Sequence, residues 1–294
     1  MAVSAHELGH ALGLWHEQSR PDAGNYITVV PENIMKGQLH NFLTRSPEQL
    51  LNLSIPYDLG SVMHYGPTAF SIHYELRTIE TVEPAYQRTI GQREQPSFLD
   101  VKTINRAYCE GIRPFECING GYVHPRHCDR CLCPSGLAGT FCEENEKWPS
   151  QQCGEVIQVK PFPQYTVIQN PSYPRQDKAP TKCSWLLEAD TGSRISMEFI
   201  ETFAFLCEPT CRDYVEVKNN SNLVQTGMSL NDFDAECAFS SCCAPYKPDG
   251  SRCIKSHGTD DDIYLQVGQS EMQQQEAIAL DITAAYFIIS SILT

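Results

Sequence analysis

The sequence predicts an α+β segment, then a small disulfide-rich module, and then an all-β sandwich. Three observations predict this order. The chain opens on a helical pattern with two histidines four residues apart, His6 and His10. Thirteen of the fourteen cysteines follow residue 110. Later runs such as Ile195–Phe199 alternate apolar and polar residues, as strands with one buried face do. The predicted boundaries are 1–109, 110–143, 153–268 and, for an irregular C-terminal tail, 269–294.

The opening helix has the residues of a metal site. Positions i and i+4 share one face of a helix, so His6 and His10 can reach one ion, with Glu7 beside it to hold a water. Gly13 can end the helix in a left-handed conformation, and His16 then supplies a third nitrogen. Three protein ligands and an open position are typical of catalytic zinc, whereas structural zinc sites have four ligands.

Two plainer interpretations of this stretch stay open. The pattern also fits an ordinary amphipathic helix with surface histidines, and Ser4 with Glu7 fits a capping box. A second element downstream argues against both interpretations. The run Ser61-Val62-Met63-His64-Tyr65 resembles the Met-containing turn that follows the zinc helix of metzincins.

Further runs resemble the astacin family of metzincins. They are His16-Glu17-Gln18-Ser19-Arg20-Pro21-Asp22, Tyr57-Asp58, Thr89-Ile90-Gly91-Gln92 and Ser97-Phe98-Leu99-Asp100. The resemblance implies a secreted, zinc-dependent endopeptidase that hydrolyses extracellular proteins or peptides. It implies one Zn²⁺ per site on His6, His10 and His16, with Glu7 as general base and then general acid.

The same resemblance assigns roles to the Met-turn. It implies that Met63 lies beneath the metal as an apolar floor. It also implies that Tyr65 is a further zinc ligand, which can swing away and donate a hydrogen bond to the oxyanion of the reaction. A plain core tyrosine is the alternative for Tyr65. We expect His64 to be structural, since three histidines already suffice.

The start of the chain leads to a separate expectation. Met1 lies five residues before the first expected ligand, which leaves no room for a signal peptide. In astacins an N-terminal half built on a twisted sheet precedes the zinc helix. The resemblance therefore implies that residues 1–109 are the C-terminal half of a catalytic domain. We expect Leu8 and Trp15 to be partly exposed, and the chain on its own to be inactive.

Local signals predict further elements of the first segment. Tyr26–Val30 favours a short strand. Ser46, with Pro47 and Gln49 after it, is typical of a capped helix start, and we expect a short helix through residues 50–51. Ser97 is the expected cap of a last helix that closes the segment.

Residues 117–142 resemble an EGF-like module through the spacing of Cys131, Cys133 and Cys142. About thirty residues bury too small a core, so disulfides restrain the unfolded chain instead. Cys133 and Cys142 are disulfide candidates, and a zinc knuckle is the alternative. Cys109 is either a sixth cysteine of the module or the partner of a half-domain outside this chain. No calcium site is expected, because the acidic opening of calcium-binding modules is missing.

The third module resembles a CUB domain. The resemblance rests on Asn170–Pro174, Cys183–Trp185 and Cys211–Val217, and it implies a first disulfide between Cys153 and Cys183. Glu201 and Asp213 are either a calcium site or solvated carboxylates. The apolar end, residues 277–294, is too short and too polar for a membrane span. It is either a strand of the sandwich or an aberrant terminus.

The composition limits the classes of partner that this chain is expected to bind. With 22 Lys and Arg against 36 Asp and Glu, the formal charge is −14, which argues against nucleic acid. The cysteines indicate an oxidising, secreted setting, and Asn52 and Asn219 begin sequons. The EGF-like and CUB surfaces are expected to bind matrix or other proteins. The alternative function is a secreted binding or matrix protein with a vestigial protease half.

Overall fold

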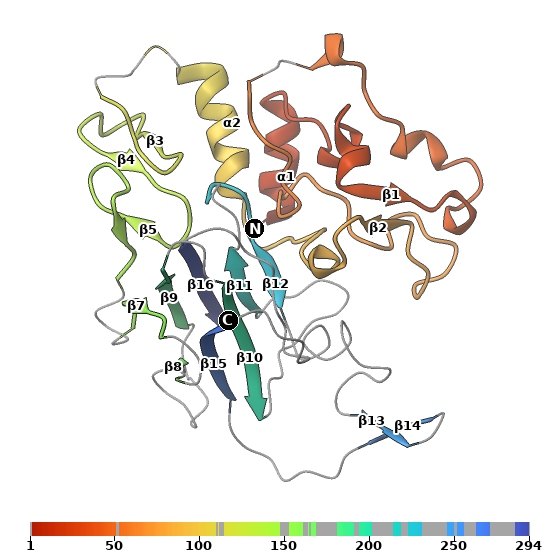
Figure 1. Ribbon diagram of the computed structural model, residues 1–294. Helices are drawn as coiled ribbons and strands as arrows, with labels where there is room; N and C mark the ends of the chain where they lie inside the picture. The colour runs from red at the N-terminus through yellow and green to blue at the C-terminus, as the bar shows by residue number, and fades with distance from the viewer. Residues whose placement is uncertain are drawn as a thin grey trace.

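The structure is a computed structural model in which helices and short turns lie above two β-sheets (Figure 1). Several positions named above lie outside the described residues, namely Met1, Asn52, Asn170–Pro174, Cys211, Asp213, Asn219, residues 277–285 and the side chain of Glu201. The described residues are 2–50, 53–109, 111, 115–147, 153–160, 164, 166–168, 181–190, 194–201, 214–218, 223–230, 246–249, 252–255, 263–270 and 286–293.

Two helices and one pair of strands form the first segment, linked by single turns of 3-10 helix. The helices α1 and α2 lie side by side, and β1 and β2 lie on the other side of α1 (Figure 1). The strands pair antiparallel. The bounds are α1 Ala2–Ala11, β1 Ile27–Val29, β2 Ile79–Thr81, α2 Phe98–Cys109, η1 Glu17–Ser19, η2 Ala23–Asn25, η3 Pro31–Asn33, η4 Leu39–Phe42, η5 Pro47–Gln49 and η6 Pro84–Tyr86.

Helix α1 ends in a Schellman motif. Gly13 has φ +93°, the left-handed conformation that glycine adopts without steric cost. Its N–H donates to the carbonyl of His10, and the N–H of Leu14 donates to the carbonyl of Gly9. The chain therefore reverses directly after the helix, as Gly13 predicts. The capping box of Ser46 and Gln49 is also present, and the η5 turn that it opens ends at Gln49, with Leu50 in an extended conformation. Leu51 of the predicted helix lies outside the described residues.

Helix α2 begins at a reciprocal cap that also reaches the Met-turn. The amide of Asp100 donates to Ser97 Oγ at 3.0 Å, and the amide of Ser97 donates to Asp100 Oδ2 at 2.9 Å. The same carboxylate accepts from Ser61 Oγ at 2.6 Å and from the amide of Val62 at 2.9 Å. Burial raises the pKa of Asp100, and these hydrogen bonds oppose that rise. One buried carboxylate thus joins α2 to the Met-turn.

The small module beside α2 is built on short strand pairs and disulfides. Strand β3 pairs with β4, and β5 pairs with β6. Disulfides join Cys117 to Cys131 and Cys133 to Cys142. Among the described residues, Cys109 and Cys128 are free thiols. The bounds are β3 Tyr122–Val123, β4 Cys131–Leu132, β5 Leu137–Ala138 and β6 Glu144–Asn145.

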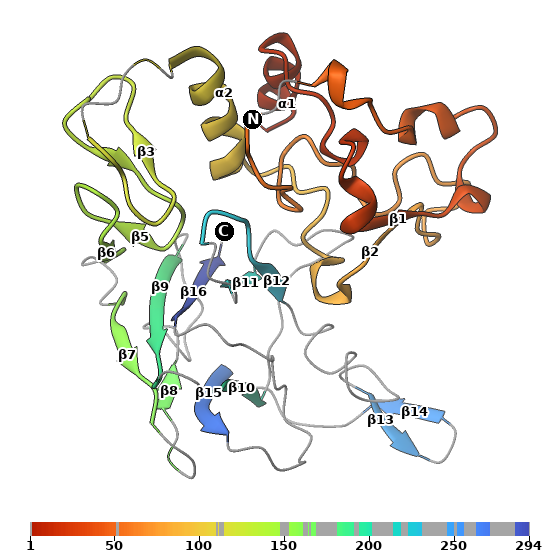
Figure 2. The same ribbon diagram turned by 45° about the horizontal axis from the view of Figure 1, so that its top comes forward.

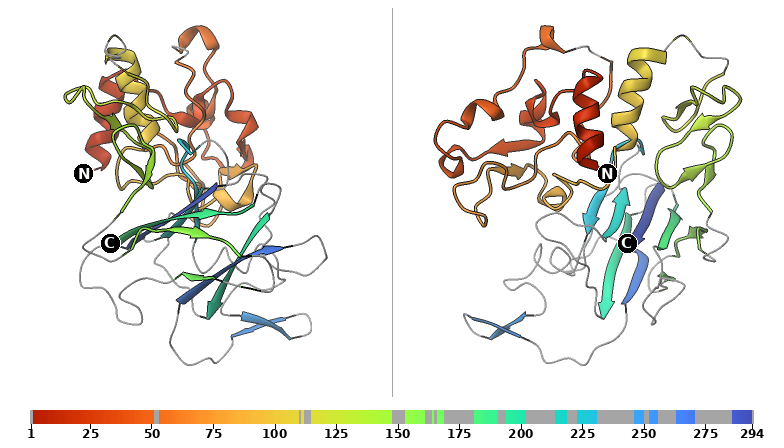
Figure 3. Two further views of the ribbon diagram at one scale, coloured as in Figure 1. Left: turned by 60° about the vertical axis from the view of Figure 1, so that its left-hand side comes forward. Right: turned by 180° about the vertical axis from the view of Figure 1, so that it is seen from behind.

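The last module is a sandwich of two sheets. Its five-stranded sheet has the order β12-β11-β16-β9-β7, and the facing sheet has the order β10-β15-β8. A separate hairpin, β13–β14, stands away from both sheets in each view (Figure 3). The bounds are β7 Val156–Gln158, β8 Thr166–Ile168, β9 Thr181–Glu188, β10 Arg194–Glu201, β11 Tyr214–Lys218, β12 Met228–Leu230, β13 Tyr246–Asp249, β14 Arg252–Lys255, β15 Ile263–Ser270 and β16 Tyr286–Leu293.

The sandwich core receives side chains from both sheets. Trp185 and Val217 from the larger sheet pack in one buried cluster with Ile168 and Ile195 from the smaller one. A disulfide joins Cys153 to Cys183, and the Cys183 side chain is fully buried. In β9 the alternate residues Cys183, Trp185 and Leu187 enter this core.

The end of the chain differs from the irregular tail that the sequence predicts. Residues 286–293 form β16, which pairs antiparallel with β11 on one side and β9 on the other. This segment reads YFIISSIL, a β-prone and mostly apolar run that suits a central strand. The sandwich therefore includes residues beyond 268. Among the described residues, no helix is both long and apolar enough to cross a membrane.

We predict that Asp100→Ala lowers the free energy of unfolding of the first segment by roughly 2–4 kcal/mol, because three hydrogen-bond donors lose their buried acceptor. Denaturant titration of the full chain, followed by hydrogen exchange in α2, measures the change. The matched control is Asp129→Ala, which removes an exposed carboxylate. A change for Asp100→Ala as small as that for the control would contradict this prediction.

Candidate metal centre

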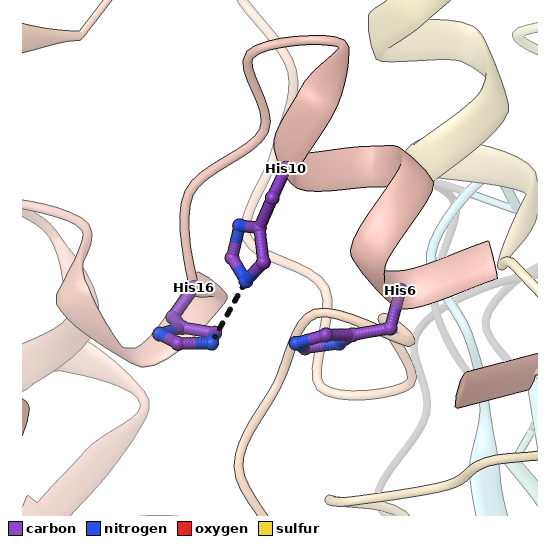
Figure 4. Close-up of side chains that lie close together, drawn as sticks. All are labelled: His6, His10 and His16. Carbon is purple, nitrogen blue, oxygen red and sulfur yellow. Dashed lines mark hydrogen bonds between the residues drawn. The ribbon is translucent and has the colours of Figure 1, made fainter. Parts of the chain in front are cut away.

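The three histidines expected from the sequence meet at the end of α1. One ring nitrogen of each histidine lies within 4.8 Å of the corresponding nitrogens of the other two. Figure 4 shows His6 and His10 projecting from the helix toward His16, which stands on the returning chain. His10 Nε2 and His16 Nε2 are 3.1 Å apart. Among the described residues, this is the single group of three or more His, Cys, Asp or Glu side chains arranged to hold a metal ion.

Backbone carbonyls fix the tautomers of the two helical histidines. His6 Nδ1 donates to the carbonyl of Val62 at 2.8 Å, and His10 Nδ1 donates to the carbonyl of Leu14 at 2.9 Å. A neutral imidazole carries one N–H, so both Nε2 atoms keep a lone pair for a ligand. The Met-turn and the reversal after α1 therefore orient these two rings.

The donor set fits zinc. With Zn–N bonds of about 2.0–2.1 Å, two ligands of a tetrahedral ion are separated by about 3.3–3.4 Å. The 3.1 Å between His10 Nε2 and His16 Nε2 is close to that separation. Three imidazole nitrogens are also the ligand number that leaves a tetrahedral position open for water or substrate.

Electrostatics keep the third histidine neutral. Burial lowers the pKa of His16 to about 4, and the charges of His10, His6, Arg93 and Arg45 act in the same direction. Arg45 also stacks over the exposed ring of Trp15, with its guanidinium carbon 4.0 Å from the ring centre. A neutral imidazole is the form that binds a metal.

Met63 packs beneath the helix that holds the first two histidines. It is 1% exposed and forms a small core with Ala2, Val62 and Leu14. A Cβ on Gly9 would lie 2.8 Å from Met63 Sδ, so the helix approaches the turn at its glycine. Met63 also accepts a hydrogen bond at its carbonyl from the amide of Glu17, at 3.2 Å.

Tyr65 lies against the third histidine. Its ring centre is 4.5 Å from that of His16 and 5.7 Å from that of Phe42. Burial raises the pKa of the Tyr65 phenol, which keeps it protonated as a hydrogen-bond donor. Glu7 is exposed on α1, and no hydrogen bond or ion pair among the described residues engages its carboxylate.

The fourth histidine of this region, His64, is structural. It is fully buried and lies outside the three-histidine group. Burial lowers its pKa to about 4. The neutral ring donates from Nδ1 to the carbonyl of Tyr65 at 2.7 Å and accepts at Nε2 from Tyr57 Oη at 2.7 Å. In the sequence, Tyr57 contributes only to the resemblance to a known family. No local pattern predicts its hydrogen bond to His64.

A cavity adjoins the Met-turn without including the histidines. Its volume is about 600 Å³, and Met63, Glu17 and Leu99 are among its lining residues. Burial raises the pKa of Glu17 to about 8, opposed by the charge of Arg20 and by the amide of Asp58. The metal centre and this cavity therefore have different lining residues, although both adjoin the Met-turn.

Two segments of the chain match known families. Residues 1–109 match the Astacin family of peptidases, and residues 153–230 match the CUB domain. The first 109 residues are therefore similar in sequence to a family of peptidases.

Curated relatives from nematodes match most of this chain. Zinc metalloproteinase nas-36 of Caenorhabditis elegans is 49% identical over 238 residues, which are 80% of this chain and 38% of the relative. Zinc metalloproteinase dpy-31 of the same species is 45% identical over 233 residues, 78% of this chain and 39% of the relative. The chain thus spans about two fifths of the length of these relatives.

One solved structure is also similar in sequence. High choriolytic enzyme 1, a hatching enzyme zinc-protease from the medaka fish Oryzias latipes, is 41% identical. The match covers 36% of this chain and 52% of that chain. The TM-score is 0.34, too low to establish a shared fold.

We predict that Tyr57→Phe lowers the free energy of unfolding by about 1–3 kcal/mol, because it leaves the buried Nε2 of His64 without a donor. Tyr74→Phe is the matched control, since Tyr74 is 78% exposed. Thermal and denaturant unfolding of both variants beside the wild type measures the difference. Equal stabilities of the two variants would show that this hydrogen bond contributes nothing.

Proposed function

We propose that this chain is part of a zinc-dependent endopeptidase that hydrolyses extracellular proteins or peptides. The observation that carries the proposal is the three-histidine group, which brings one ring nitrogen of each residue within 4.8 Å of the others and places His10 Nε2 and His16 Nε2 3.1 Å apart. The match of residues 1–109 to a peptidase family supports it. The disulfides and the CUB match support an extracellular setting, with the two smaller modules as surfaces for protein partners.

The proposed chemistry divides between the ion and the side chains. His6, His10 and His16 hold the zinc ion, which when bound lowers the pKa of a water and polarises the peptide carbonyl. Glu7 accepts the proton of the attacking water and later returns it to the leaving amine. Tyr65 donates a hydrogen bond from its phenol to the oxyanion that develops in the transition state.

Zinc binding is measured first, because it tests the metal site independently of catalytic turnover. Leu8 is 59% exposed and Trp15 is 46% exposed, as expected from the sequence, so apolar surface near the site is open to solvent. Loss of one equivalent of zinc on triple replacement of His6, His10 and His16 by alanine supports the site. No zinc in the wild type at any concentration would favour a binding or matrix protein instead.

We predict that Glu7→Gln keeps zinc and lowers turnover by roughly three or more orders of magnitude, in a form of the protein that cleaves peptide. The amide has the shape of the carboxylate but cannot accept the proton. Metal content and kcat/KM on a casein-derived peptide are measured on the same preparation. The control is Glu75→Gln, another exposed carboxylate. Activity within tenfold of wild type would remove Glu7 from the mechanism.

We predict that Tyr65→Phe lowers kcat much more than it changes KM, since the lost oxygen acts in the transition state. The ring that packs against His16 is kept, so zinc content should not change. Steady-state kinetics on the zinc-loaded protein separates the two constants. A rise in KM with unchanged kcat would instead assign Tyr65 to substrate binding.

A further inference from the structure

A loop of the sandwich lies against the chain that leads into the Met-turn. We call residues 223–229, which run into β12, the sandwich loop. Figures 1 and 2 both show this part of the chain at the end of α2 where that helix begins. Gln225 Nε2 donates to the carbonyl of Tyr57 at 3.0 Å, and the amide of Ser229 donates to Thr89 Oγ1 at 3.0 Å. The two segments are far apart in sequence, so their contact is a tertiary interaction.

Gly60 is the point of closest approach. A Cβ on Gly60 would lie within 3.0 Å of three side-chain atoms of Thr226, a distance that real Cβ atoms do not tolerate. The φ of Gly60 is not positive, so its backbone conformation is open to any residue. The three atoms nearest to a Cβ at this position all belong to Thr226, so Thr226 is the first obstacle to a side chain here.

Two buried charged side chains of β11 hold the sandwich loop in place. Glu216 accepts from the amide of Gly227 at 2.7 Å and from Ser135 Oγ at 3.2 Å. Lys218 donates to the carbonyl of Leu223 at 3.0 Å and to that of Ser135 at 3.3 Å. Both charged side chains are about 5% exposed or less, and buried charges are stable only when they are paired and hydrogen-bonded. Strand β11 thus holds the loop at Leu223 and Gly227, and Ser135 of the small disulfide module binds the same two charged side chains.

The contact reaches the metal centre through side chains already described. Tyr57, whose carbonyl binds Gln225, donates from its hydroxyl to His64. The other nitrogen of His64 donates to the carbonyl of Tyr65, and the Tyr65 ring lies on His16. Gly60 is followed directly by Ser61 and Val62, and the carbonyl of Val62 orients His6. A displacement of residues 57–60 would therefore move groups on two sides of the site.

We infer that the sandwich loop is a buttress for the Met-turn, with Thr226 and Gln225 as positioning residues for the three-histidine site. The role of the sandwich in this protein then includes holding the metal centre in shape, in addition to any partner it binds. The contact itself does not depend on the proposed function. Only its consequence for zinc affinity rests on that function.

A double-mutant cycle tests the contact in the full chain. The variants are Gly60→Ala, Thr226→Gly and the two together, with Gly24→Ala as control, because a Cβ on Gly24 meets nothing within 4 Å. Hydrogen exchange of peptides across residues 57–65 is measured without zinc, and zinc affinity is measured separately. We expect Gly60→Ala to speed exchange and weaken zinc binding by roughly tenfold each, and its effect to shrink severalfold in the Thr226→Gly background.

Several outcomes would overturn the inference. One is an effect of Gly60→Ala no larger than that of Gly24→Ala, and another is an effect that is the same with and without Thr226.

A second pair of variants, which introduce no steric clash, is used if Gly60→Ala does not fold. Gln225→Ala removes the bond to Tyr57, and Gln158→Ala is the same change at an exposed position of β7, where the amide donates to Glu188. Equal exchange in these two variants also contradicts the inference. Failure of all proteins to bind zinc contradicts the proposed function, while the exchange data still decide the contact.

Discussion

The carboxylate of Asp100 is the interaction on which the first segment depends. It is buried, and it accepts hydrogen bonds from the cap of α2 and from two donors of the Met-turn. One of those donors is the amide of Val62, whose carbonyl in turn accepts from His6. Helices α2 and α1 are thereby both hydrogen-bonded to the Met-turn. A buried carboxylate is stable only with such a full set of donors, so cap and turn require each other.

The sequence predicts the local parts of the site and misses the distant ones. The spacing of His6, His10 and His16 predicts their meeting because helix periodicity and the turn at Gly13 are local properties. Ser97 is the cap that the sequence predicts for α2, and Ser97-x-x-Asp100 has the spacing of a capping box. Nothing local reveals that Asp100 also binds the Met-turn, or that Tyr57 binds His64. Such pairs are joined only by tertiary packing.

The same distinction explains the sandwich. Its alternating runs predict strands with one buried face, and Trp185 and Ile195 lie in one core. The position of β16 between β11 and β9 could not be derived, because an eight-residue apolar run suits a strand, a helix or a terminal segment. The packing of Thr226 on Gly60 is likewise invisible in sequence, since a lone glycine gives no sign of what approaches it.

The central place of β16 has a consequence for folding during synthesis. Chains fold broadly from the N-terminus as they emerge, so the histidine segment is available long before residues 286–293 leave the ribosome. Until then, β11 and β9 have no partner between them, and each exposes an unpaired edge that invites aggregation. The larger sheet can close only after residues 286–293 have emerged from the ribosome. This strand order therefore favours protection of the nascent β9 and β11 edges until that point.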